Sequence, residues 1–79
     1  MITGAQIRAA RAMLRWSADD LATKARLGVA TVRRADAANG VPTITPANAH
    51  AIRAALEDAG VEFIPENGSG AGVRMRKGI

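Results

Sequence analysis

Two short helical segments separated by a tight break constrain this chain more than any other feature of its sequence. Ser17 followed by Asp20 forms a capping box with an acidic first turn, which predicts a helix from residue 18 onward. The helical pattern stops at "RLG", residues 26–28, where the leucine is the expected buried residue of a turn and the glycine starts the next helix. The pattern therefore predicts two short helices joined by a turn of three or four residues.

The second of these helices, predicted at residues 29–38, carries a basic outer face. Val32 and Ala35 fall at helical spacing and are expected to point into the core. The dipeptide "NG" at residues 39–40 is expected to end the helix, because asparagine and glycine tolerate a left-handed conformation. The side chains expected to face away from the core are Val29, Ala30 and Arg33, together with Arg34 or Ala37.

Two longer helices flank this pair. The first is predicted at residues 3–14, with Ile7, Ala10 and Leu14 on its apolar face and Trp16 as a core residue after it. The other begins at Pro46, after the N-cap residue Thr45, and ends at a glycine cap, Gly60. The basic residues expected on the solvent face of the first helix are Arg8, Arg11 and Arg15.

The end of the chain reads as a hairpin. The runs "VEFI" and "GVRMRK" are separated by "PENGSGAG", which is rich in turn residues. We expect Val61 and Phe63 to lie opposite Val73 and Met75, with Glu62 near the arginines on the other face. An isolated two-stranded hairpin is marginal in water, so it must pack on the helices or meet its twin in a second subunit. The fold class is mainly α, with four helices at residues 1–60 and the hairpin with its basic tail at residues 61–79.

Composition limits the classes of function. A chain of 79 residues without cysteine forms one domain without disulfides, and its single histidine, His50, is expected at the surface rather than in a metal site. No apolar run is long enough for a signal peptide or a membrane span, which predicts a cytoplasmic protein. No catalytic constellation emerges, since the pair Asp19 and Asp20 belongs to the first turn of a helix. We therefore expect neither an enzyme nor a bound cofactor.

The charge distribution favours nucleic acid as a partner. Residues 1–40 hold seven basic against three acidic residues, whereas residues 41–64 hold one basic against three acidic. One electropositive face on an otherwise neutral body is typical of DNA-binding proteins. In a helix-turn-helix unit the second helix enters the major groove, where Arg33 is the candidate to bind a guanine base. The candidate DNA-binding residues are Ser17, Ala18, Lys24, Val29, Ala30, Thr31, Arg33 and Arg34.

The sequence resembles a known family over nearly its whole length. The segments "IRAARAMLRWSADDLATKA", "VATVRRAD" and "VPTITPANAHAIRAAL" are similar to the helices of XRE/Cro-type, lambda-repressor-like helix-turn-helix regulators. The tail resembles the ending of a subgroup of small bacterial members. The resemblance implies a sequence-specific transcriptional regulator, commonly a dimeric repressor. The chain departs from the family pattern at Ala18, where glutamine is usual, at Arg26, where glycine is usual, and at Gly28, which lacks the capping hydroxyl.

The expected assembly is a homodimer on a pseudo-palindromic operator. Because one such module offers limited contact area, two recognition helices would enter successive major grooves about 34 Å apart. We expect the dimer contact to come from the hairpin, with help from the last helix, through Val61, Phe63, Val73 and Met75. A second possibility stays open, in which the chain is a protein-interaction module, such as an antitoxin or accessory subunit, whose hairpin binds a partner protein. The basic run "RMRK" fits either a phosphate-binding tail or an ordinary charged strand face.

Overall fold

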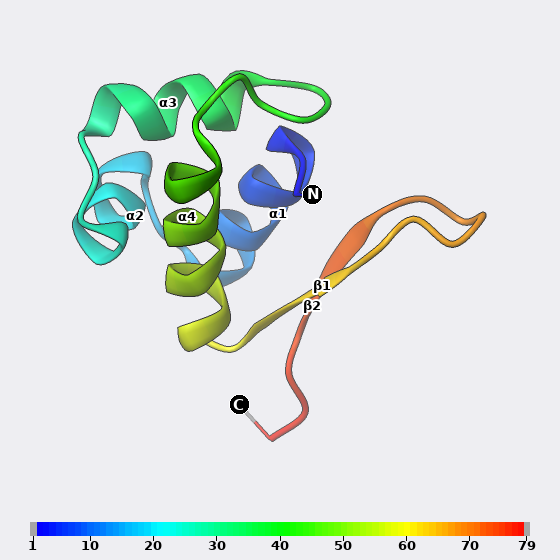
Figure 1. Cartoon of the computed structure of the whole chain (residues 1–79). Helices are drawn as coiled ribbons and strands as arrows, with labels where there is room; N and C mark the ends of the chain where they lie inside the picture. The colour runs from blue at the N-terminus through cyan, green and yellow to red at the C-terminus, as the bar shows by residue number, and fades with distance from the viewer. Residues whose placement is uncertain (1, 79) are drawn as a thin grey trace.

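The computed structural model of the chain describes residues 2–78 and contains four helices followed by a two-stranded antiparallel hairpin (Figure 1). The mainly helical fold class is thus confirmed at this level. None of the described helices is long and apolar enough to cross a membrane. The elements are α1 (Gly4–Leu14), α2 (Ala18–Ala25), α3 (Val29–Ala37), α4 (Pro46–Asp58), β1 (Val61–Ile64) and β2 (Gly72–Met75).

Side-chain caps define where the helices begin. The predicted capping box of α2 is confirmed, because the Ser17 hydroxyl accepts from the Asp20 amide at 3.0 Å and the Asp20 carboxylate accepts from the Ser17 amide at 2.8 Å. Thr45 caps α4 as predicted, with a proline in the first turn. Helix α1 begins one residue later than predicted, because Thr3 is its N-cap and forms a capping box with Gln6.

The helix ends differ from prediction in one place. Gly60 has φ = 106°, in agreement with the predicted glycine cap after α4. The expected left-handed ending at residues 39–40 is wrong, because the chain leaves α3 through an extended residue, Ala38. The left-handed non-glycine residues are instead Arg15 and Arg26, the C-caps of α1 and α2.

A small apolar core joins all six elements. Trp16 lies half-buried against this core, at the junction between α1 and α2. Val61 brings the hairpin into the same cluster, at 1% exposure. The largest fully buried side chains are Ile7, Leu21, Val32, Ile52, Leu56 and Val61.

The start of α1 lies directly against the end of α3. A Cβ atom built on Gly4 would lie 1.9 Å from the carbonyl oxygen of Ala38 and 2.7 Å from that of Ala35. The amide of Gly4 also donates to the carbonyl of Gly40 at 2.9 Å. Only glycine fits at this position, because any side chain would overlap the backbone of α3.

The hairpin has the predicted register and packs on the helices of its own subunit. Val61 pairs with Met75, Phe63 with Val73, and Glu62 with Arg74, whose side chains form an ion pair at 2.8 Å. The buried Gln6 side chain donates to the carbonyls of Ile64 at 3.3 Å and Gly72 at 2.9 Å, which ties both strands to α1. The loop between the strands projects away from the helices (Figure 1).

Candidate nucleic-acid interface

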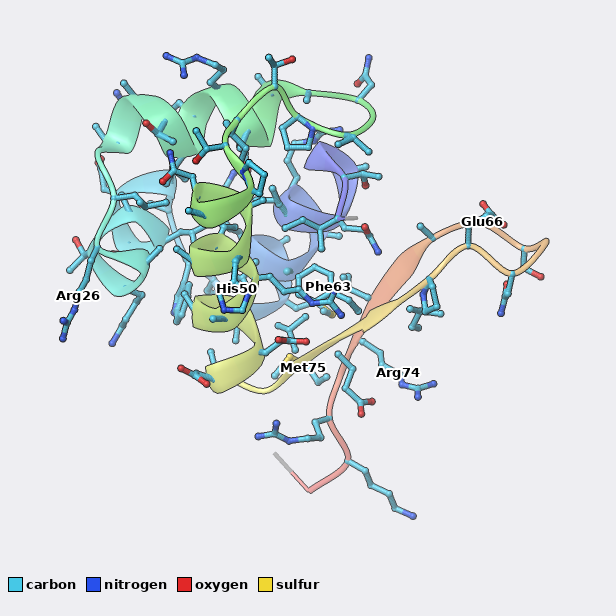
Figure 2. All side chains as sticks on the ribbon, viewed as in Figure 1. Arg26, His50, Phe63, Glu66, Arg74 and Met75 are labelled. Carbon is cyan, nitrogen blue, oxygen red and sulfur yellow. The ribbon has the colours of Figure 1, made fainter. Side chains whose placement is uncertain are left out.

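The break between α2 and α3 consists of three residues that act in different ways. Arg26 ends α2 in a left-handed conformation, with φ = 58°, and its side chain points away from α3 (Figure 2). Leu27 is half-buried against the core, as predicted for the turn. Gly28 is the N-cap of α3 and supplies no side-chain hydrogen bond. The start of α3 is therefore held by backbone bonds and by packing rather than by a side-chain cap.

Helix α3 has a buried face and an exposed face of different character. Val32 and Ala35 are fully buried, as predicted. At about 3.6 residues per turn, the two alanines Ala30 and Ala37 lie on the opposite side of the helix from this buried pair. Arg33 and Arg34 flank the alanines, one on each side, and all four residues are exposed. We call these four residues the outer face of α3; small side chains along its middle let a surface approach the helix backbone closely.

The two neighbouring arginines point toward different parts of the molecule. Arg33 lies next to the start of α2, where its Nη2 atom is 3.5 Å from Oδ1 of Asp19. Arg34 lies next to the start of α4 and lines an open groove of about 350 Å³. The other residues that line this groove are Thr43, Ile44, Thr45 and Asn48. A polyanion lying along α3 would therefore meet a guanidinium group on both sides of the helix.

The remaining predicted DNA-binding residues are placed unevenly. Ser17 is exposed, but its hydroxyl is engaged in the cap of α2, and Ala18 beside it is half-buried. Lys24 is exposed in the last turn of α2, away from the Asp19 end of that helix. Thr31 is half-buried. The structure thus brings the first turn of α2 together with the outer face of α3 and leaves Lys24 apart from them.

The prediction that Val29 faces away from the core is wrong. Val29 is half-buried and packs against the core cluster. The reason is helical spacing, because residue 29 lies three positions before the buried Val32 and shares much of its face. Ala30 is the exposed residue of that pair.

The prediction that Arg8 and Arg11 face solvent is also wrong. Arg11 forms a bidentate ion pair with Asp36 of α3, at 2.8 Å and 3.1 Å, and donates to the carbonyl of Trp16 at 2.8 Å. Arg8 donates to the carbonyls of Asp36 and Ala38 at the end of α3. The hydrogen bond to Asp36 raises the pKa of Arg11 above its ordinary value, against the opposing effect of partial burial. Both arginines act as structural clamps on α3.

This clamp, formed by Arg8, Arg11 and Asp36, lowers the number of basic side chains that residues 1–40 offer to an external partner. Two of the seven basic side chains in residues 1–40 point into the fold instead of contributing to an open surface. Asp36 is the one acidic residue of α3, which is a sequence signal for an internal partner. The basic side chains of this half that remain exposed are Arg15, Lys24, Arg26, Arg33 and Arg34.

The residues predicted for dimerisation already have partners in their own subunit. Val61 is 1% exposed, so its side chain is not available to a second subunit in this conformation. Phe63, Val73 and Met75 are half-buried against the core, and the Phe63 ring lies 5.2 Å from the Arg53 guanidinium carbon. Dimerisation through the hairpin stays a prediction. Any such contact has to use the exposed parts of Phe63, Val73 and Met75 or the strand backbones.

The hairpin loop has an ordered conformation of its own. One oxygen of the Glu66 carboxylate accepts from the amides of Gly68 and Gly70, both at 2.8 Å. The bond from Gly70, followed by that from Gly68, lowers the pKa of Glu66 below its ordinary value of 4.5. Figure 2 shows Glu66 in the projecting loop, at a distance from the helices. The loop therefore presents a defined shape to solvent.

The side chains that could coordinate a metal ion lie apart from one another in the described part of the chain. Within residues 2–78 no group of three or more histidine, cysteine, aspartate or glutamate side chains is arranged to hold a metal ion. His50 is exposed and lines a shallow hollow of about 180 Å³ with Ile2, Pro46, Ala49 and Arg53.

Neither a protein-family model nor a curated protein matches this chain.

Proposed function

We propose that the chain is a sequence-specific double-stranded DNA-binding regulator of the lambda-repressor-like helix-turn-helix type. The observation that carries this proposal is the outer face of α3, where Ala30 and Ala37 form a low surface between two exposed arginines. A helix with small residues along its middle fits into the major groove, and arginine is the side chain that most often binds guanine there. The resemblance of the α2–α3 unit to the XRE/Cro family supports the same function.

The clamp supports this function by fixing the position of α3. Arg11 and Asp36 form two hydrogen bonds between α1 and α3, and Arg8 binds the carbonyls at the end of α3. A recognition helix has to be held rigidly, because base contacts lose strength when their geometry is off by a small amount. The inner side of α3 thus fixes the helix in the fold, and its exposed outer side is available to contact DNA.

The two arginines of the outer face would then have different tasks. Arg33, in the middle of α3 and beside Asp19 at the start of α2, is the candidate for base recognition. Arg34 lines the groove in front of α4 with Thr43 and Thr45, where hydroxyl and guanidinium groups suit a backbone phosphate. In this arrangement α3 lies in the major groove and the starts of α2 and α4 face the two flanking strands.

We propose further that the protein acts as a homodimer on a pseudo-palindromic operator and represses transcription by occluding a promoter. One α3 helix reads too few base pairs for a specific site, and two helices one helical turn apart, about 34 Å, double the sequence that is read. Sedimentation equilibrium of the full chain, free and with operator DNA, tests this assembly. A single chain bound per operator would contradict it.

The first experiment is selection of bound duplexes from a random DNA library at about 150 mM salt. A two-fold symmetric enriched motif would support the regulator, and salt-sensitive retention of all sequences alike would contradict it. Arg33→Ala is then expected to weaken binding to the selected site by about 1–3 kcal/mol and to relax the preference at one base pair.

The matched control for Arg33→Ala is Arg76→Ala. Arg76 is also exposed and its replacement removes the same charge, but it follows β2 on the hairpin. Arg76→Ala is expected to lower the affinity for every DNA sequence by the same small factor, without a change in base preference. Equal effects of the two variants on base preference would rule out Arg33 as the base-reading residue.

A second function is favoured by one observation, the ordered loop that projects from the hairpin. An exposed loop held by internal hydrogen bonds suits the capture of a partner protein, as in an antitoxin or an accessory subunit. Under this function, substitutions in residues 66–70 abolish partner capture while Arg33→Ala is silent. Under the DNA-binding function, the same loop substitutions leave operator binding unchanged.

A further inference from the structure

Within residues 2–78, Asp19 is the one acidic side chain that forms an ion pair with the outer face of α3. Its Oδ1 atom lies 3.5 Å from the Nη2 atom of Arg33, and the two side chains are 69% and 63% exposed. The ion pair is therefore largely exposed to solvent. Such a pair is weak, and the arginine can exchange its partner at little cost.

The position of Asp19 is not required by the cap of its own helix. Asp20 fills that role, since its carboxylate and amide both bond with Ser17. Within residues 2–78, the one ion pair of the Asp19 carboxylate is the one with Arg33. An acidic residue in a first turn interacts well with the helix dipole, but that interaction does not depend on a partner in α3. The cross-helix pair is an additional feature.

The charge of Asp19 has opposite effects on the two kinds of contact that Arg33 can make. A phosphate carries a full negative charge, so a carboxylate next to the guanidinium repels it and cancels part of its attraction. A guanine edge presents neutral acceptor atoms, O6 and N7, which tolerate a neighbouring carboxylate. Asp19 thus penalises phosphate contacts by Arg33 far more than base contacts.

We infer that Asp19 is a specificity-determining residue that holds Arg33 for base recognition and suppresses its binding to backbone phosphates. This inference rests on the proposed DNA-binding function. Asp19 is a positioning residue, because it acts through Arg33, and its effect is measured by the ratio of specific to non-specific affinity.

The test compares Asp19→Asn with the wild-type chain on two duplexes, the selected operator and a scrambled sequence, over a range of salt concentrations. We expect the variant to bind the scrambled duplex roughly fivefold more tightly at about 150 mM salt and to show a steeper salt dependence. Affinity for the operator should change by less than about twofold, so the specificity ratio falls. The asparagine keeps the size of the side chain, and thermal unfolding checks that the fold is intact.

Two further variants separate the inference from a simple change in net charge. Asp58→Asn removes the same charge at the exposed end of α4 and is expected to raise both affinities by the same factor. In an Arg33→Ala background, Asp19→Asn should no longer change the specificity ratio, because the residue through which it acts is gone.

The outcomes distinguish this inference from the proposed function. If the wild-type chain selects an operator and Asp19→Asn raises both affinities equally, as Asp58→Asn does, the role of Asp19 is refuted and the DNA-binding function stands. An effect of Asp19→Asn that persists without Arg33 also refutes it. If the wild-type chain selects no sequence, the proposed function fails and this inference fails with it.

Discussion

Helix α3 is joined to its neighbours by two arginine–aspartate pairs that differ in almost every physical respect. Arg11 and Asp36 meet at 2.8 Å and 3.1 Å, with side chains only 20% and 16% exposed. Arg33 and Asp19 meet at 3.5 Å through a single pair of atoms, and both side chains are more than 60% exposed. The first pair is partly desolvated and bidentate, so it fixes position. The second is hydrated and single, so its arginine stays free to bind another partner.

The difference shows that residue type alone does not assign a role. Both pairs join α3 to another helix, and both use the same two kinds of side chain. Burial and the number of hydrogen bonds decide whether such a pair holds two helices together or leaves its arginine available on the surface.

The largest effect is expected for Gly4→Ala, at the contact of α1 with the end of α3. The new Cβ atom would overlap the Ala38 carbonyl oxygen, 1.9 Å away, so the helices must move apart. We expect a loss of roughly 3 kcal/mol or more in the free energy of unfolding, measured by urea titration. Gly40→Ala is the control, because a Cβ there meets nothing within 4 Å. Equal losses for both variants would contradict the close approach at Gly4.

A smaller loss is expected for Asp36→Asn, which removes the charge that faces Arg11. The guanidinium would keep its partly buried position without an anionic partner, at a cost of about 2 kcal/mol in unfolding free energy. Asp19→Asn removes the same charge from the exposed pair and should cost less than about 1 kcal/mol. Urea titration of the two variants gives the comparison directly. Similar losses would mean that the two pairs do not differ in the way their burial indicates.

The smallest effect is expected on acidification, at the hairpin loop. The pKa of Glu66 is lower in the folded loop than in the unfolded chain, because its carboxylate accepts from Gly70 and Gly68. The ionised Glu66 carboxylate thus stabilises the folded loop at pH values above its ordinary pKa. This contribution to the free energy of unfolding is lost as the pH falls through the lower folded-state pKa. The amide NMR signals of the two glycines should report a titration midpoint below 4.5. A midpoint at or above this value would refute the stabilisation of the Glu66 carboxylate by the loop amides. Glu66→Gln should abolish the pH-dependent shift of both glycine signals.

Local signals in the sequence were sufficient to predict most of the fold. The caps at Ser17 and Thr45, the glycine at residue 60 and the alternation of residues in the hairpin are each set by neighbours within a few positions. Such features depend on short-range hydrogen bonding and on the period of the apolar residues. For the same reason the inner face of α3 was predicted at Val32 and Ala35.

The errors at Arg8 and Arg11 have a different physical cause. Arg8 and Arg11 lie on the polar side of an amphipathic helix, and helical periodicity cannot tell a solvated polar face from one that meets another helix. Their partners lie 25 to 30 residues further along the chain. The pairing of Asp19 with Arg33 and the close approach at Gly4 were missed for the same reason. These contacts depend on how helices are arranged in space, which the spacing of residues in one helix does not encode.

The side chain of Gln6 couples two regions that are remote in sequence. Its amide oxygen accepts from Thr3 at 2.9 Å, which completes the cap of α1, while its nitrogen holds the carbonyls of Ile64 and Gly72, up to 66 positions away. Fraying of the first turn of α1 would therefore weaken the attachment of both strands, which are also held by the burial of Val61. We expect local opening at one of these regions to lower the cost of opening at the other.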